Sequence, residues 1–165
     1  MTGDPLATMA VEVEASFDAP VDRVWSLLSD VERMAGLGPE HVAASWVTTG
    51  PAVGARFVGT NRRGTFEWDV PCVVTACAPP HLLEWTVGEA PGQSSTWSYT
   101  LAARDDGATD VVQRFRHGPG FSYVRQRVDR SPDEAAAIID GRCAMLRQGM
   151  TETLAAAAQV LATEG

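Results

Sequence analysis

The chain has 165 residues, of which 45% are hydrophobic and 21% charged, which suits one globular domain with a sizeable core. Its net charge is −8, every basic residue is an arginine and the arginines form only small groups, which argues against a nucleic-acid partner. No apolar run reaches the length of a membrane span and no signal-peptide core precedes the first hydrophobic strand pattern, so we expect a cytoplasmic protein without integral membrane association.

The N-terminal third is predicted to hold one strand and two short helices. Residues 1–9 are short and polar with a glycine and a proline, which is typical of a flexible lead-in. Hydrophobic and polar residues then alternate over 11–17, the period of a half-buried strand. A proline opens a helix over residues 20–28, and a second helical turn is expected over 30–34 before glycines end it.

The central hundred residues are predicted to form strands. Six are expected, over residues 41–49, 56–63, 65–76, 82–87, 95–103 and 109–117. Glycine, proline and aspartate turns separate them. Short strands at this spacing indicate an antiparallel meander rather than parallel βαβ units.

Residues 118–130 are predicted to connect the last strand to a C-terminal helix. They carry Phe121 and Tyr123 among two glycines and a proline. Aromatic side chains in such a connection either plug the edge of the core or cover the mouth of a cavity. The sequence leaves both readings open, and with them whether this segment forms a lid.

One long helix is expected from residue 131 to about residue 163. Ser131 as N-cap, Pro132 at the first helical position and Glu134 predict its start. Apolar residues then recur at three- and four-residue steps in one stripe: Ile139, Cys143, Leu146, Met150, Leu154, Ala157 and Leu161.

These elements predict an α+β fold in a single domain over residues 10–165. A curved antiparallel sheet of about seven strands wraps around the long C-terminal helix, with two short helices after the first strand. A sheet curved around a helix rarely closes tightly, so we expect a cavity between them.

The order of elements resembles that of the helix-grip proteins. The sequence is similar to the bacterial polyketide cyclase/dehydrase branch of the SRPBCC (START/Bet v1-like) superfamily at residues 17–30, 54–57, 73–80, 83–85 and 97–101. The resemblance covers nearly the whole chain, but these residues are mostly core and turn positions. It implies the helix-grip fold and a hydrophobic cavity, whereas members include aromatase/cyclases, hydrolase-like and dehydratase-like enzymes, lipid carriers and proteins without assigned activity.

Alternation along the strands predicts which side chains meet a ligand. Trp68, Trp85, Trp97 and Tyr99 are expected on the concave face of the sheet, either as core fillers or as cavity walls. The other apolar residues expected at the ligand are Phe115 on the last strand, Phe121 in the connection, and Leu146 and Met150 on the helix.

Polar residues on the same inward face are the candidate chemical groups. Asn61 and Arg63 share a face with a phenylalanine, and Gln113 and His117 share one with Phe115. A buried polar group needs a partner, so we expect Asn61, Arg63 and Gln113 to bind the ligand. His117 and Tyr123 are the candidate acid/base residues, although His117 ends a strand and could simply be exposed.

Other features are expected to be structural. Glu67 and Asp69 alternate against tryptophan and should face solvent, and Asp140 and Arg142 are interpreted as surface residues of the helix. The three cysteines have no metal-ligand spacing and read as small core hydrophobes. No metal site and no cofactor are predicted.

The predicted function is binding of a hydrophobic polyketide-like, aromatic or acyl small molecule, with a leaning toward a cyclase/dehydrase-type enzyme. A non-catalytic carrier of lipids or other small molecules is the alternative. An interaction protein with a collapsed cavity is the third hypothesis, and a homodimer is a further possibility.

Overall fold

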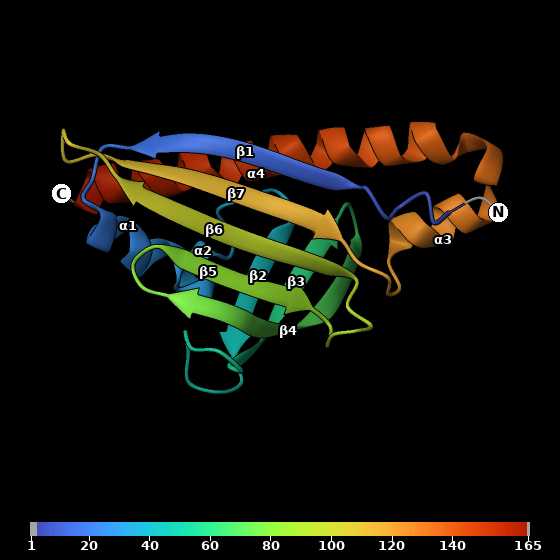
Figure 1. Cartoon of the computed structure of the whole chain (residues 1–165), viewed down its shortest axis with the longest axis horizontal. Coiled ribbons are helices and arrows are strands. Elements are labelled where there is room, and N and C mark those ends of the chain that lie inside the picture. The colour runs from blue at the N-terminus through green and yellow to red at the C-terminus, as the bar shows by residue number, and fades with distance from the viewer. Residues whose placement is uncertain (1–2, 165) are drawn as a thin grey trace.

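The computed structural model describes residues 3–164 and contains one seven-stranded antiparallel sheet (Figure 1). Its strands follow the order β1-β7-β6-β5-β4-β3-β2. They are β1 (Ala10–Phe17), β2 (His41–Trp46), β3 (Arg56–Arg63), β4 (Phe66–Ala78), β5 (Leu82–Val87), β6 (Ser95–Ala103) and β7 (Thr109–His117). The predicted meander of seven strands is therefore confirmed, and the first strand returns to pair with the last.

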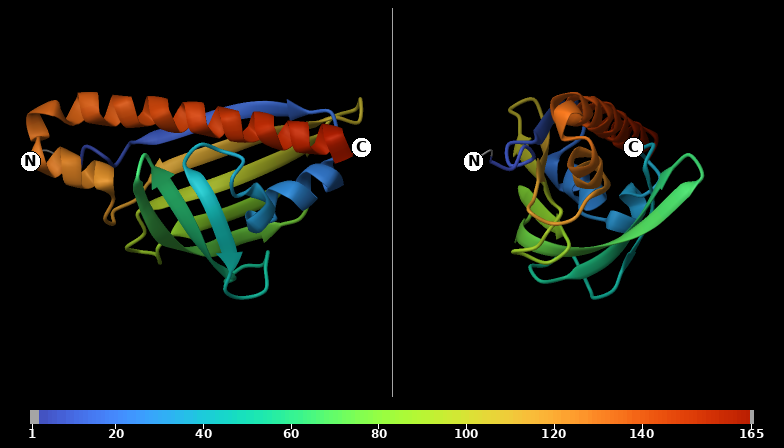
Figure 2. Two further views of the ribbon diagram at one scale, coloured as in Figure 1. Left: turned by 180° about the vertical axis from the view of Figure 1, so that it is seen from behind. Right: turned by 90° about the vertical axis from the view of Figure 1, so that its right-hand side faces the viewer.

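The helices lie inside the curve of this sheet and at its ends (Figure 2). They are α1 (Val21–Leu28), α2 (Val31–Met34), α3 (Tyr123–Arg130) and α4 (Ala135–Glu164), with a 3-10 turn over Pro132–Glu134. Viewed along its length, the sheet forms a trough with α4 along the top. This is the expected helix-grip fold. No helix within residues 3–164 combines the length and apolar character needed to cross a membrane.

Helix α4 is longer than the strands that it covers. Its 30 residues extend about 45 Å, whereas the nine residues of β7 extend about 31 Å. The helix therefore overhangs one end of the trough, where α3 folds back beneath it (Figure 1). Its buried residues are Ile138, Leu146, Met150, Leu154, Ala157 and Leu161, whereas Ile139 and Cys143 of the predicted stripe are only half-buried.

The segment between β7 and α4 differs from the prediction. Residues 123–130 form α3, where the sequence predicted only a connection. Ser131 ends α3, with its N–H bonded to carbonyls of that helix, and its side chain caps nothing. The predicted positions of Ser131 as N-cap and Pro132 in the first turn are confirmed for the 3-10 turn that leads into α4, but the capping hydrogen bond expected of the Ser131 side chain is absent.

The predicted lead-in is in contact with the domain. Residues 1 and 2 lie outside the described part of the chain, but Leu6 and Met9 are buried and Asp4 forms an ion pair with Arg125. Residues 4–9 thus pack beside α3 rather than standing free.

Candidate functional site

A cavity of about 850 Å³ lies between the concave face of the sheet and α4. This volume is within the range of small-molecule pockets, roughly 300–1,000 Å³. The exposed residues that line it include Phe121 in the loop before α3, Tyr123 at the start of α3, Met145 on α4 and Gly64 at the β3–β4 turn. The opening between α3 and the β3–β4 hairpin is called the mouth below.

All of the residues predicted to bind the ligand or act in catalysis line this one cavity. They are Asn61, Arg63, Trp68, Trp85, Trp97, Tyr99, Gln113, Phe115, His117, Phe121, Tyr123, Leu146 and Met150. They come from β3 to β7, α3 and its preceding loop, and α4, which only the tertiary fold brings together.

Aromatic rings form the walls of the cavity on β5, β6 and β7. The rings of Trp85 and Trp97 are nearly parallel, with centroids 6.4 Å apart and an interplanar angle of 8°. Phe115 packs edge-on against Trp97 at 4.9 Å, and Tyr99 lies 5.4 Å from Trp85. Trp97 is held in place because its Nε1 donates to Ser95 Oγ at 3.0 Å. Flat, rigid surfaces of this kind suit an aromatic or acyl ligand.

Two polar side chains face each other across β6 and β7 within this aromatic region. Tyr99 and Gln113 are directly opposite in the strand register, and both are buried. Gln113 is only 4% exposed, and its Oε1 finds no hydrogen-bond donor among the described residues. Burial raises the pKa of the Tyr99 phenol well above its usual range, so it stays a neutral donor. Such a pair can orient a carbonyl or hydroxyl of a ligand.

A second polar group lies where β2, β3 and α4 meet. His41 Nδ1 lies 3.4 Å from Asn61 Oδ1, and burial lowers the pKa of His41. Glu40 accepts two hydrogen bonds from Arg142 at 2.8 and 2.9 Å and one from Arg63 at 3.3 Å. Burial alone would raise the pKa of Glu40, but the two arginines outweigh it and lower that pKa.

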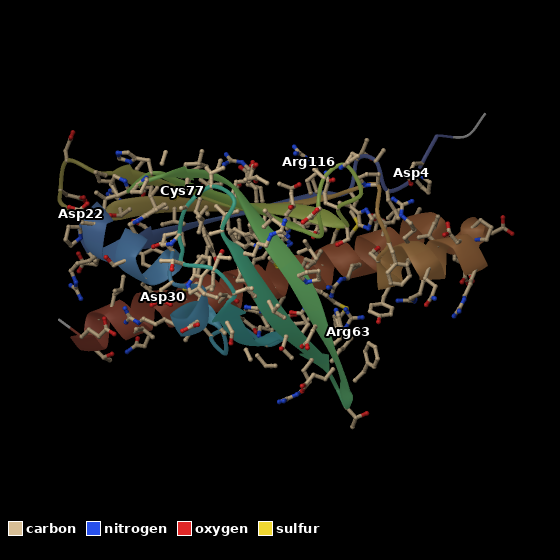
Figure 3. The ribbon with its side chains drawn as sticks, turned by 90° about the horizontal axis from the view of Figure 1, so that it is seen from below. Asp4, Asp22, Asp30, Arg63, Cys77 and Arg116 are labelled. Atoms are coloured by element: carbon tan, nitrogen blue, oxygen red, sulfur yellow. The ribbon has the colours of Figure 1, made fainter. Side chains whose placement is uncertain are left out.

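This arrangement corrects one prediction and qualifies another. Arg142 was expected at the surface, but it is largely buried because Glu40, 102 residues away in sequence, neutralises it at the cavity wall. Arg63 lines the cavity but remains partly exposed, beside the ring of Trp68 at 5.6 Å. Figure 3 shows Arg63 on the strand near the tip of the β3–β4 hairpin.

An aromatic cluster spans the mouth from the hairpin to α3. Trp68 stacks on Phe66 at 5.2 Å, and Tyr123 packs edge-on against both rings and against Phe121. Phe121 is 62% exposed and Phe66 is 51% exposed. These contacts join Tyr123, the first residue of α3, to the β3–β4 hairpin at the edge of the cavity.

His117 is buried at the inner side of this mouth with both ring nitrogens engaged. Its Nδ1 lies 2.7 Å from the carbonyl oxygen of Gly118, and its Nε2 lies 2.7 Å from Ser122 Oγ. A carbonyl only accepts, so Nδ1 carries the proton and Nε2 accepts from the Ser122 hydroxyl. The exposed strand end considered from the sequence is therefore ruled out. Burial is the main cause that lowers the pKa of His117.

The residues treated as structural mostly have that role. Glu67 and Asp69 are exposed and each accepts a hydrogen bond from β3, although Asp69 is also among the residues that line the cavity. Cys72 is buried, and burial raises the pKa of its thiol to about 12. Cys77 and Cys143 are only half-buried, so the reading as core hydrophobes holds fully for Cys72 alone. Within residues 3–164 no group of three His, Cys, Asp or Glu side chains is placed to hold a metal ion.

Sequence reasoning missed several polar residues that line the cavity, among them Glu40, His41, Ser122 and Arg142. Ser122 is of a residue type that favours N-caps, but the eight residues after it show too little periodicity to predict a helix there. The Glu40–Arg142 pair has no local signature.

Comparisons with solved structures agree with this architecture. A polyketide-cyclase-like protein from Corynebacterium glutamicum is similar over 95% of this chain and 93% of its own, with 25% identity and a TM-score of 0.69. A protein from Mesorhizobium loti matches over 94% and 98%, with 19% identity and a TM-score of 0.64. One from Thermus thermophilus matches over 94% and 99%, with 13% identity and a TM-score of 0.66. The latter two likenesses bear on the fold alone.

The search of curated proteins finds no match. The family model described as polyketide cyclase / dehydrase and lipid transport matches residues 8–159, which is nearly the whole chain and includes most of the cavity wall. The fold, the hydrophobic cavity and this match agree, and the chain belongs to the polyketide cyclase / dehydrase and lipid transport family.

Proposed function

We propose that the protein binds a polyketide-like, aromatic or acyl compound in its cavity and acts on it as a cyclase/dehydrase-type enzyme. The observation that carries the binding proposal is the buried Gln113 amide, which lies without a partner for its Oε1 in a cavity otherwise walled by aromatic rings. A ligand that is mostly apolar and carries a hydroxyl group, which can donate to Oε1, satisfies both features.

The proposed reaction is enolisation or loss of water from a substrate held in a folded conformation. The walls limit the conformations of the bound chain, so proximity supplies much of the rate. Neutral His117 takes the proton, with the Ser122 hydroxyl moving aside or relaying it. Tyr123 at the mouth is the proposed acid. The Tyr99 hydroxyl donates to the carbonyl oxygen, and Gln113 Oε1 accepts from a hydroxyl of the substrate.

Binding is tested by calorimetry with 1-anilinonaphthalene-8-sulfonate and with octanoate as probes. Leu146→Trp fills the cavity from α4, and we expect it to weaken probe affinity at least about 10-fold, whereas Val53→Trp at an exposed loop position leaves it unchanged. Equal affinity in both variants would show that the probes bind elsewhere.

Enolisation is tested with the N-acetylcysteamine thioester of an aromatic β-keto acid. NMR follows exchange of its α-protons for deuterium above the buffer rate. His117→Ala should lose the protein-dependent exchange while the calorimetric affinity survives. Exchange at the wild-type rate in this variant would remove His117 from the mechanism.

A non-catalytic carrier is the second candidate, and one observation favours it. Both nitrogens of His117 are occupied by hydrogen bonds within the protein, and Tyr123 packs in the aromatic cluster at the mouth. A carrier needs these groups only to shape the entrance. Tight binding of a probe that returns unmodified, with no exchange above buffer, supports this candidate.

A further inference from the structure

Ser122 and His117 form a nucleophile–base pair at the cavity mouth. Ser122 Oγ lies 2.7 Å from His117 Nε2, within the range of a serine hydroxyl bonded to its general base. The Gly118 carbonyl, 2.7 Å from Nδ1, fixes the tautomer that leaves Nε2 free to accept a proton. Both side chains line the cavity.

The loop that carries Ser122 is held rigidly. Arg125 donates to the carbonyls of Gly118 and Gly120 at 3.0 Å each and forms a two-point ion pair with Asp4. A Cβ on Gly118 or Gly120 would approach the β5–β6 turn to 2.3 or 2.1 Å, so only glycine permits this packing. The loop before Ser122 is therefore held by the Arg125 side chain and by its packing against the β5–β6 turn.

Hydrogen-bond donors for an oxyanion lie next to this serine. Ser122 is the N-cap of α3, and its Oγ accepts from the N–H of Arg125 at 3.0 Å. The N–H groups of the first two helical residues, Tyr123 and Val124, have no acceptor among residues 3–164, and both residues line the cavity. Free N–H groups at a helix N-terminus stabilise negative charge, and the N–H that follows a nucleophilic serine is a common oxyanion donor.

The interior of the cavity supplies a place for an apolar acyl group. His117 shares the inward face of β7 with Phe115 and Gln113, so the space beside Ser122 continues between the aromatic walls. A carbonyl at Ser122 can thus keep its hydrocarbon or aromatic part inside and its leaving group at the mouth.

From this arrangement we infer that Ser122 is an acyl-accepting nucleophile and that the protein hydrolyses esters or thioesters of apolar carboxylic acids. The inference rests on the proposed binding of an apolar ligand in the cavity but not on the proposed enolisation.

The reaction balances with water as the only co-reactant. Ser122 Oγ attacks the acyl carbon while its proton passes to His117 Nε2, and the carbonyl oxygen becomes an oxyanion facing the N–H groups of α3. Collapse breaks the bond to the alcohol or thiol, which leaves with the proton from Nε2. Water activated by His117 then cleaves the acyl-serine, releases the carboxylic acid and restores the hydroxyl.

The test separates this role from that of a helix cap. Asparagine caps a helix about as well as serine but offers no hydroxyl, so Ser122→Asn should keep α3 folded. The probes are an alkyl fluorophosphonate, detected by peptide mass spectrometry, and p-nitrophenyl octanoate. We expect one label per chain, on Ser122, and a loss of octanoate ester hydrolysis of about 100-fold or more in Ser122→Asn and in His117→Gln. Ser26→Ala, on the exposed face of α1, serves as the unaffected control.

Labelling at another residue, no labelling, or wild-type hydrolysis by Ser122→Asn overturns the inference. Octanoate calorimetry on the same samples distinguishes the two proposals. Octanoate binding without labelling rejects the nucleophile and leaves the binding function intact, whereas absence of octanoate binding in the wild type rejects the binding proposal itself.

Discussion

The trough has a packed end beside α1 and a hollow end beside α3, and the same strands build both. The inward face of β7 runs from Thr109 and Val111, which are fully buried in the packed end, to Gln113, Phe115 and His117, which line the cavity. The same change occurs along α4, where Leu154 is buried in the core and Leu146 lines the cavity.

One buried polar side chain at each end shows a difference in hydrogen bonding. At the packed end, the Thr109 hydroxyl donates to the carbonyl of Ala19 at 2.8 Å. At the hollow end, Gln113 Oε1 has no donor within residues 3–164. A polar group left unpaired costs stability, so the comparison indicates that the hollow end gives up stability for binding.

The largest expected effect comes from truncating a leucine at each end of α4. Leu154→Ala should lower the free energy of unfolding by about 2–5 kcal/mol, because it opens a void in a close-packed region. Leu146→Ala should cost less than half as much, because its side chain already borders empty space. Urea denaturation of both variants measures the difference. Equal losses would mean that the two ends are packed alike.

Two substitutions on the inward face of β7 should change the free energy of unfolding by smaller amounts and in opposite directions. Thr109→Val leaves the Ala19 carbonyl without its donor and should destabilise by about 1–3 kcal/mol. Gln113→Leu removes the unpaired amide and should be neutral or stabilising by about 1 kcal/mol, while it weakens probe binding. Urea denaturation reports the signs, and destabilisation by Gln113→Leu would show that this amide is satisfied.

The smallest effect is a pH dependence that belongs to the hollow end. Burial is the main cause that lowers the pKa values of His41 and His117 from 6.5. The unfolded chain therefore protonates these two histidines more readily than the folded chain does. The contribution of the neutral, buried histidines to stability is complete above pH 6.5 and falls as the pH drops below it. The double variant His41→Asn, His117→Gln should flatten the decrease in unfolding free energy between pH 7 and pH 5.5. An unchanged slope would place the sensitive groups elsewhere.

The alternation of residues predicted the fold well because the strands are buried on one face only. That pattern placed Trp85 and Trp97 on the inward face, and the structure finds them there. The long helix was equally predictable from the sequence, since its apolar stripe spans many turns. Helix α3 was not, because eight residues with one buried valine give little periodicity.

The polar part of the candidate site was predictable mainly where a strand carried it. Gln113 and His117 follow from the alternation along β7, although the sequence could not show that Gln113 lacks a partner. Arg142 was misplaced because its partner Glu40 lies 102 residues away and is adjacent only in the fold. The proximity of Ser122 to His117 depends on a tight loop whose path is set by contacts with the β5–β6 turn.

The ion pair between Asp4 and Arg125 has a practical consequence for handling the protein. Figure 3 shows Asp4 beside α3, whereas α4 ends at the opposite side of the molecule, near α1 (Figure 1). An affinity tag or fluorophore fused ahead of Asp4 would place extra chain next to its ion pair with Arg125, the residue that holds the loop before α3. The far end of α4 is the better attachment point for immobilisation or labelling.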